Sequence, residues 1–335
     1  MRLTQLIPLT LCLPAGALVA YAAALDQSLT LALPIDCKFG ETCFIQQYFD
    51  HDPGPLAKDY RCGPMSYDGH DGVDLRLPTL AAQKKGVAVF AAAAGTVRGA
   101  RDGMDDVSVA LAGPDSVKGR ECGNGVVIAH PGGWETQYCH MAKGSVRVRN
   151  GQQVAAGTTL GLVGMSGDAE FPHLHFGVRH NGDKIDPFAA DAAPGACGGK
   201  SLWSREAAAA LGYRSPELIN FGFVPQTLTM ADVESGQAAE LSAQVAAGSP
   251  ALIAFVRAIG LKSGDVQTMT LRGPDGQIMA TSETAALMRD RAQQFLFVGK
   301  RRTANELPRG VYEAEYDVRR DGAPLFSRRF SLTLR

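Results

Sequence analysis

The sequence predicts a mainly β protein with two folded parts, an antiparallel β-sheet or barrel-sandwich domain followed by an immunoglobulin-like β-sandwich. Three observations predict this class. The chain has 335 residues, which is more than one average domain. From about Gly63 onward, short apolar runs bounded by glycine replace any helical period. Near Phe221 the composition changes, which marks the start of the second β region.

The overall composition is that of an ordinary globular protein with ample core. Hydrophobic residues make up 45% of the chain and charged residues 20%, and the formal net charge is -1. This balance gives no electrostatic reason to expect binding to nucleic acid or to a charged membrane surface.

Residues 1–22 are predicted to be a signal peptide. Arg2 supplies a positive charge, Leu6–Val19 is a leucine-rich run, and Ala20–Ala22 offers an A-x-A cleavage site. The apolar run is short and interrupted by proline, so we expect no stable membrane span in the mature chain. An uncleaved anchor is the alternative. Cys12 lacks the small residues expected before a lipid-modified cysteine. The exported protein is expected in the periplasm or outside the cell.

Residues 23–62 form a lead-in with one predicted strand at Phe44–Phe49 and a turn at Asp52–Pro55. This segment either wraps the following domain or partly covers its cleft.

Residues 63–200 are predicted to form the first domain. The expected strands are short and separated by glycines, at Val87–Phe90, Gly95–Val97, Val107–Leu111, Gly125–Ile128 and Thr136–Tyr138. The turn–strand rhythm of Asn150–Gly164 resembles the barrel-sandwich layout of lipoyl and biotinyl carriers. A carrier needs a lysine at a hairpin tip, and Asn150–Gly167 contains none, so carrier function is disfavoured.

A linker is expected at 201–220 with a short helix at Glu206–Leu211, and 221–335 is predicted to be the β-sandwich accessory domain. Its expected strands are Thr227–Met230, Ala238–Val245, Ser249–Ile259, Val266–Arg272, Ile278–Ala280, Gln294–Val298, Gly310–Val318 and Leu325–Leu334. No catalytic constellation follows Phe188. We therefore expect the accessory domain to act in binding, positioning or assembly, with a partner that the sequence does not name.

Six cysteines remain after the signal peptide, and an even number in an exported chain indicates disulfides. Predicted hairpin strands at Val126–His130 and Trp134–His140 bring Cys139 close to Cys122. Cys37 and Cys43 are near enough to close a short loop. The remaining pair is Cys62 with Cys197, at the two ends of the first domain.

The stretch Phe171–Val178 carries the strongest functional pattern. It is predicted to be a strand, so His173 and His175 share one face with Cα atoms roughly 7 Å apart. Leu174, Phe176 and Val178 share the other face and are expected to pack inward. Two imidazoles on one strand face are typical of a metal site. The pattern does not say which of the two would bind the metal.

Further candidate ligands lie upstream. His70 and Asp74 are four residues apart in a glycine-rich segment, and His140 follows Tyr138 and Cys139. The other three histidines are each beside turn residues and are predicted to be solvated loop side chains: His51, His130 and His180.

The three motifs, His70-x-x-x-Asp74, Tyr138-Cys139-His140-Met141 and His173-Leu174-His175, resemble those of the LytM/lysostaphin-type (M23) zinc metallopeptidases from about Gly63 to Phe188. Members of that family are peptidoglycan endopeptidases. The resemblance implies one Zn²⁺ ion per chain, held by His70, Asp74 and His175. It also implies that His140 and His173 activate water and stabilise the transition state.

Four neighbouring features go with this resemblance. Gly72 is expected to permit a tight turn between two ligands, and Gly164–Gly167 to form a flexible cleft loop. Tyr138 is expected on the face of His140, either as a donor to an oxyanion or as a packed aromatic of the cleft wall. Phe171, where many relatives have glycine, is expected to narrow the cleft.

The sequence thus predicts a zinc metalloendopeptidase that cuts peptide cross-links or stems of peptidoglycan. The bond would be a D-Ala–diaminopimelate link or a glycine-rich bridge, and an oxidising periplasm favours the former. Two alternatives remain. One is a non-catalytic wall-binding or amidase-regulating module. The other is a zinc endopeptidase of glycine-rich proteins.

Overall fold

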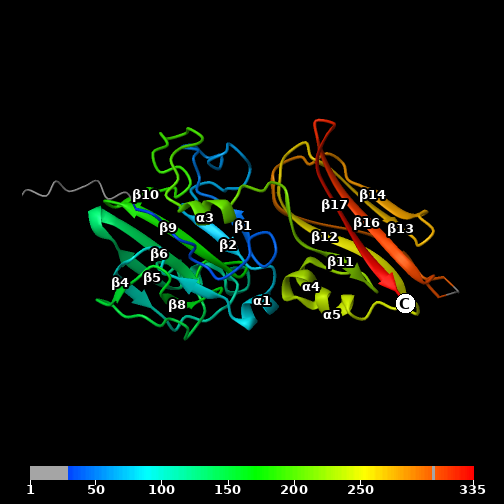
Figure 1. The fold of residues 1–335 in the computed structure, drawn as a ribbon, viewed down its shortest axis with the longest axis horizontal. Coiled ribbons are helices and arrows are strands. Elements are labelled where there is room, and N and C mark those ends of the chain that lie inside the picture. The colour runs from blue at the N-terminus through cyan, green and yellow to red at the C-terminus, as the bar shows by residue number, and fades with distance from the viewer. Residues whose placement is uncertain (1–28, 304–305) are drawn as a thin grey trace, which may run out of the picture.

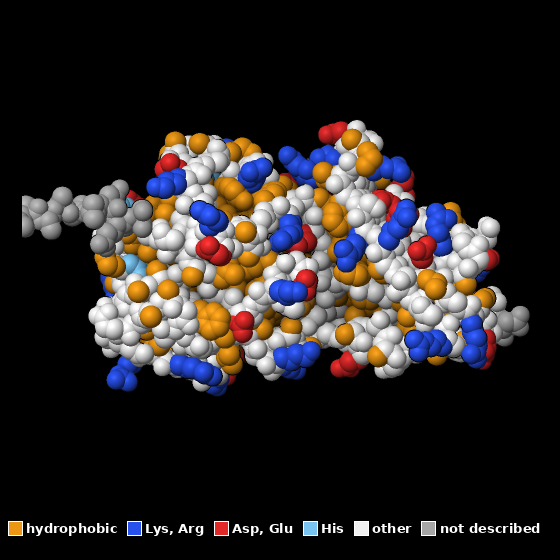
Figure 2. Space-filling model, in the orientation of Figure 1, with side chains coloured by type: hydrophobic (Ala, Val, Ile, Leu, Met, Phe, Trp, Pro, Cys, Tyr) orange, Lys and Arg blue, Asp and Glu red, His pale blue; other side chains and the backbone are white. Residues whose placement is uncertain are grey.

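The computed structural model describes residues 29–303 and 306–335, so the predicted signal peptide lies outside the described residues. Figure 1 shows two β-rich bodies side by side, with the N-terminal half of the chain in one and the C-terminal third in the other. Within the described ranges, no helix is both long and apolar enough to cross a membrane. Acidic and basic side chains are interspersed over both bodies on the face shown in Figure 2.

The first body is built on one eight-stranded sheet. Its strands run in the order β1-β2-β9-β6-β5-β4-β7, with β10 paired to β9. Their bounds are β1 (Phe44–Gln47), β2 (Val73–Arg76), β4 (Gly95–Arg101), β5 (Asn124–Ala129), β6 (Trp134–Met141), β7 (Gln153–Val154), β9 (His173–His180) and β10 (Asp183–Ile185). A two-stranded sheet pairs β3 (Ala88–Phe90) with β8 (Thr159–Leu162). The antiparallel, mainly β prediction is confirmed.

Short helices connect these strands. They are α1 (Leu80–Lys85), α2 (Val109–Ala112) and 3₁₀ turns at Pro114–Val117 and Pro131–Gly133. The last of these joins β5 to β6 as the predicted hairpin. The strand prediction for Val107–Leu111 was wrong. Only Val109 of α2 is buried, with its N–H on the Ala169 carbonyl, while Leu111 points to solvent. An alternating pattern without a partner strand did not specify a sheet.

The alternation of β9 is confirmed. Leu174, Phe176 and Val178 are at most 1% exposed and belong to the large core under the sheet. Each stands opposite a residue of β2 or β6, because β9 is a central strand. His173 and His175 therefore lie on the opposite side of the strand, which faces away from the core.

The lead-in is part of this sheet and of its core. β1 pairs antiparallel with β2, Leu31 bridges Trp203, and Ile35 bridges Val89. Leu31 and Ile35 are both buried. The segment wraps the domain as an edge strand, and its polar side chains Gln46 and Gln47 also reach the groove described below.

The three predicted disulfides are confirmed. Cys37–Cys43, Cys122–Cys139 and Cys62–Cys197 close loops with sequence separations of 6, 17 and 135 residues. Cross-linking a long loop removes more entropy from the unfolded chain than cross-linking a short one. The Cys62–Cys197 bond is thus expected to stabilise the first body most.

The second body follows α3 (Arg205–Ala210) and consists of two antiparallel sheets, ordered β11-β12-β15 and β14-β13-β16-β17. The strands are β11 (Glu217–Val224), β12 (Ala251–Leu261), β13 (Val266–Arg272), β14 (Ile278–Glu283), β15 (Arg291–Arg301), β16 (Gly310–Arg320) and β17 (Ala323–Leu334). One hydrophobic cluster contains residues of both sheets, including Val256, Leu271 and Tyr316. The immunoglobulin-like class of this sandwich remains a prediction.

Two helices replace strands that the sequence predicted. They are α4 (Met230–Ser235) and α5 (Gln237–Ser242), which cover the outer face of the β11–β12–β15 sheet. Thr229 and Asp232 form a capping box that starts α4. Ala238 and Leu241 are both buried and three residues apart, which is a helical spacing rather than an alternation. Strand β11 begins at Glu217, inside the stretch that was expected to be linker.

Buried charges join the two bodies. Arg76 of β2 and Arg257 of β12 are both fully buried, and each donates to Oε2 of Glu234 on α4. Arg257 also donates to the Pro78 carbonyl. Removing one partner of such a buried cluster is strongly destabilising, by roughly 3–5 kcal/mol, because a charge is left without compensation. The cluster therefore fixes how the two bodies meet.

Candidate metal centre

Three of the predicted ligands converge at one point above the sheet. Asp74 of β2 lies directly opposite His175 of β9 in the strand register, and His70 precedes β2 in the connecting turn. Oδ1 of Asp74 is 2.9 Å from Nδ1 of His175 and 3.2 Å from Nε2 of His70. One ligand atom from each residue lies within 4.8 Å of the others. Two imidazoles and a carboxylate are a donor set that suits Zn²⁺.

The outward-facing nitrogens of the two histidines are held by other groups. Nδ1 of His70 donates to the Tyr48 carbonyl at 2.7 Å. Nε2 of His175 lies 3.3 Å from Asp71, whose other oxygen is 2.8 Å from Lys184. These bonds hold one proton of each imidazole outside the cluster, so that the inner nitrogen is the atom that can bind a cation. That is how metal-binding histidines are usually oriented, so the residues fit a cation.

The charges in the cluster agree with this arrangement. Burial raises the pKa of Asp74, but the neighbouring His70 and His173 outweigh that effect and hold it well below its usual range. Burial lowers the pKa of His175, but its bonds to Asp71 and Asp74 raise it to about 9. In the absence of a metal, His175 therefore carries a second proton at neutral pH, on the Nδ1 that faces Asp74. A cation must displace this proton in order to bind.

His140 and His173 lie beside the cluster without entering it. Their ring centroids are 4.6 Å apart. Nδ1 of His140 donates to the Ser166 carbonyl at 2.7 Å, and Nδ1 of His173 donates to the Phe171 carbonyl at 2.8 Å. Burial lowers the pKa of both imidazoles, that of His140 well below its usual value. Both are therefore neutral at pH 7, with Nε2 free to accept a proton.

Tyr138 does not share the face of His140, so of its two alternative roles that of an oxyanion donor was wrong, and the side chain is a packed aromatic. His140 has a φ of +61°, a left-handed conformation that reverses the strand alternation at this point. Tyr138 points into the core, packs on Phe176 at 5.3 Å between ring centroids, and accepts the Ala92 N–H. The alternation rule failed because it assumes regular strand backbone up to His140.

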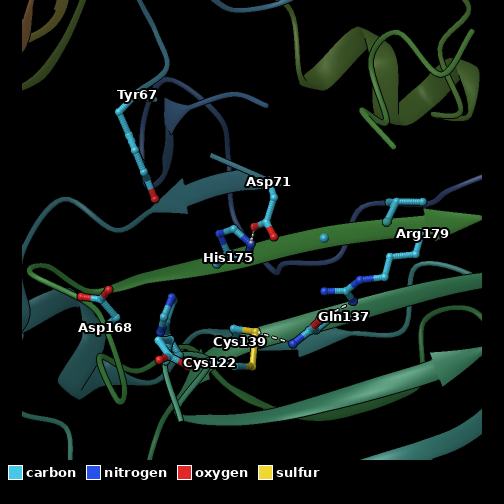
Figure 3. A pocket seen from close by; sticks show the side chains of 12 residues that line it. Tyr67, Asp71, Cys122, Gln137, Cys139, Asp168, His175 and Arg179 are labelled. Carbon is cyan, nitrogen blue, oxygen red and sulfur yellow. Dashed lines mark hydrogen bonds and ion pairs between the residues drawn. A yellow bond between two sulfur atoms is a disulfide. The ribbon is translucent and has the colours of Figure 1, made fainter. Parts of the chain in front are cut away.

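Tyr67 is the tyrosine at the site, and no motif of the sequence pointed to it. Its ring lies 4.5 Å from that of His70, and the residue is 52% exposed. Figure 3 shows its hydroxyl directed toward the space between His175 and Asp168. Burial, together with Asp74 and Asp71, raises its pKa, so the hydroxyl keeps its proton and can donate. Its position three residues before His70, in a turn, was the only signal in the sequence.

The prediction that the other three histidines are solvated was wrong for two of them. His51 is buried, with Nε2 2.6 Å from Asp186. His130 is buried between the Ala94 carbonyl and the Thr136 hydroxyl. His180, at the end of β9, is partly exposed and stacks on Trp134. Turn residues beside a histidine did not reveal that a distant carboxylate or hydroxyl would cover it.

The glycines near the site allow neighbouring chain segments to pack closely. A Cβ on Gly72 would lie 2.6 Å from Nε2 of His175 and 2.8 Å from the Phe176 carbonyl oxygen, and Gly72 is outside the left-handed region. Close packing, rather than the expected tight turn, requires glycine there. The Gly164–Gly167 loop is packed as well, since Ser166 is buried and accepts from His140.

The cluster lies where two arms of a groove meet, and both arms share Tyr67, His140, Asp168 and His175. One arm, of about 320 Å³, runs over β6 and β9 past Gln137 and Arg179, with the Cys122–Cys139 disulfide beside it (Figure 3). The other, of about 350 Å³, runs toward the second body and is lined partly by Phe171.

The antiparallel sheet thus presents a cluster that can hold a cation beside two neutral histidines that can accept protons. Residues 68–187 match the model of peptidase family M23, so this stretch of the chain is an M23-type domain. The resemblance found in the sequence is thereby confirmed.

Curated relatives match over this domain. Protease LasA of Pseudomonas aeruginosa is 42% identical over 65 residues, which are 17% of this chain and 15% of LasA. DD-carboxypeptidase/endopeptidase Mpg of Neisseria meningitidis is 40% identical over 72 residues, 21% of this chain and 16% of Mpg. Peptidoglycan DD-endopeptidase ShyA of Vibrio cholerae is 36% identical over 69 residues, which are 21% of this chain and 16% of ShyA. The chain spans less than one fifth of the length of each of these relatives.

Two solved structures match part of the chain. The catalytic domain of the prophage-encoded M23 protein EnpA from Enterococcus faecalis is 22% identical, with a TM-score of 0.32, over 47% of this chain and 98% of that one. A zinc containing peptidase from Vibrio cholerae is 25% identical, with a TM-score of 0.29, over 44% of this chain and 41% of that one.

Proposed function

We propose that this protein is an exported zinc endopeptidase that hydrolyses peptide cross-links or stems of peptidoglycan. The observation that supports this most is the convergence of His70, Asp74 and His175, with their outward nitrogens held by a carbonyl and a carboxylate. Two neutral histidines beside them supply the acid–base groups that hydrolysis needs.

A Zn²⁺ ion bound there would acidify water and polarise the substrate carbonyl. The chain's own residues orient the ligands and transfer the protons. His70, Asp74 and His175 present their inner atoms toward one point, and Asp71 and Tyr48 keep the imidazoles oriented. Fixed orientation matters because these groups need not reorganise as charge develops.

Proton transfer falls to His140 and His173. Each holds its Nδ1 proton on a carbonyl, so Nε2 is the atom that takes a proton from water and later returns it to the leaving amine. The Tyr67 hydroxyl donates a hydrogen bond to the carbonyl oxygen of the scissile amide as negative charge builds there.

The proposal that peptidoglycan is the substrate depends on the names of the relatives. ShyA is named a peptidoglycan DD-endopeptidase and Mpg a DD-carboxypeptidase/endopeptidase, which favours a bond made by a D-amino acid, such as D-Ala–diaminopimelate, over a glycine bridge. The predicted signal peptide and the three disulfides support an oxidising compartment such as the periplasm. We propose that 63–200 is the peptidase domain, with β1 of the lead-in as its edge strand, and that an immunoglobulin-like accessory sandwich runs from the start of β11 at Glu217, rather than from 221, to residue 335.

Mass spectrometry of muropeptides released from purified sacculi by the mature protein tests this function, with a chelator and with zinc added back. Loss of cross-linked dimers that the chelator abolishes and zinc restores is the expected result. Release that is insensitive to the chelator would refute zinc dependence. Tight one-to-one zinc without release from sacculi, together with cleavage of a glycine-rich protein, would refute the wall substrate. No zinc and no release would leave a binding module.

A further inference from the structure

The arm of the groove that runs toward the second body has walls from both bodies. On one side it is lined by Gln46 and Gln47 of β1 and by Arg76 of β2. On the other side it is lined by Ala292 and Gln293, the second and third residues of β15. The same pocket contains Asp74, His173 and His175, so the accessory domain reaches the edge of the metal centre.

Hydrogen bonds hold the start of β15 in this place. Nε2 of Gln46 donates to the Ala292 carbonyl at 2.7 Å. One guanidinium nitrogen of Arg76 donates to Oε1 of Gln46 at 2.8 Å and to Oε1 of Gln293 at 3.2 Å. Arg76 also stacks on the Phe171 ring at 4.2 Å. It lies opposite His173 in the register, and therefore on the same face as the metal centre.

The wall is fixed rather than loosely docked. Arg76 is fully buried and shares Glu234 with Arg257, which is also fully buried. Separating the bodies would expose this cluster or leave a charge unpaired. The accessory domain therefore stays at one position relative to the groove.

Three amide side chains line the end of this arm near the second body, Gln46, Gln47 and Gln293. Arg76 is paired with Glu234, which it shares with Arg257, and the exposed carboxylate of Glu170 also lines the arm. Gln47 is 7% exposed, and its Oε1 has no hydrogen-bond partner within the described part of the chain. A buried amide oxygen without a partner is costly unless a ligand satisfies it.

We propose that the accessory domain forms one wall of the substrate groove, and that Gln47 and Gln293 hydrogen-bond the main-chain amides of an extended peptide segment on one side of the scissile bond. Gln293 has its amide oxygen on Arg76, which leaves its nitrogen to donate. The inference rests on the proposed endopeptidase function and assigns the accessory domain to substrate positioning.

The test compares Gln293→Ala with Gln294→Ala. Gln294 is the next residue of β15 and does not line the arm, so it is a control of the same side-chain type. The substrates are a cross-linked stem peptide and versions shortened by one residue at either end. The ratio of kcat/KM between the full peptide and one shortened version should fall about tenfold in Gln293→Ala, as the loss of one hydrogen bond allows. In Gln294→Ala that ratio should match the wild type. Thermal unfolding checks that both variants fold.

Binding separates this proposal from the function on which it rests. The affinity of the same peptides for chelator-treated protein, measured by fluorescence anisotropy, should show the same preference for the full peptide and the same loss in Gln293→Ala. If the wild type cleaves no peptide but keeps this preference, the proposed function fails and the subsite stands. If Gln293→Ala keeps the wild-type ratio in both assays, or if Gln294→Ala loses as much, the subsite is refuted.

Discussion

Replacing Gly72 by alanine should weaken zinc binding without unfolding the sheet. A Cβ there would meet Nε2 of His175 at 2.6 Å and the Phe176 carbonyl oxygen at 2.8 Å. Ordinary van der Waals contact begins at 3.4 Å, so the imidazole or the backbone has to move by about 0.6–0.8 Å. The shift pushes His175 off its bond with Asp71, and loss of such an outer contact lowers metal affinity about 10- to 100-fold.

The zinc dissociation constant of Gly72→Ala is measured by competition with a fluorescent chelator, and folding by thermal unfolding of the metal-free protein. Gly99→Ala is the control, because the nearest atom to its added Cβ is Val127 Cβ at 4.0 Å. The control should bind zinc like the wild type. Wild-type zinc affinity in Gly72→Ala would show that His175 does not depend on this close approach, and the assigned packing would be wrong.

Three further predictions concern the same molecule. His175→Ala should lose zinc, whereas His173→Ala should keep zinc and lose most turnover; metal content that follows the opposite order would exchange their roles. Tyr67→Phe should lower kcat about 100-fold with unchanged zinc content, the usual effect of losing one oxyanion donor, and an unchanged kcat would remove Tyr67 from the mechanism. Burial raises the pKa of Glu217 to about 7, although Arg214 opposes it. Ionisation of Glu217 therefore costs folding stability as the pH rises from about 4.5 to 7, on the order of 3 kcal/mol in full. In urea unfolding, Glu217→Gln should be more stable than the wild type at pH 8 and equal to it at pH 4.5; equal stabilities at both would refute the raised pKa.

The sequence was sufficient where short-range geometry decides the outcome. Strand alternation placed Leu174 and Phe176 in the core and His173 and His175 on the opposite face. The hairpin around Pro131–Gly133 brought Cys122 to Cys139. In each case the period of the chain and one turn fixed the neighbours.

The sequence was insufficient where one residue or a distant contact overrides the local pattern. The left-handed φ of His140 sent Tyr138 to the core, and nothing in Tyr-Cys-His predicts that conformation. Asp186 lies 135 residues from His51 in the sequence, and only the folded chain brings its carboxylate to that imidazole. Ala238–Val245 fits both periods, and the helix packing on the β11–β12–β15 sheet decided between them. The wall formed by β15 depends on how two domains meet, which no local pattern encodes.

The Cys62–Cys197 bond makes most of the peptidase domain a covalent ring. His70, Asp74, His140, His173 and His175 all lie between these two cysteines. A single cut by a foreign protease in any loop of that ring opens it but releases no fragment. The two pieces stay tethered and held by the same sheet. A chain that is cut once within this ring would therefore keep all five of these residues in one molecule.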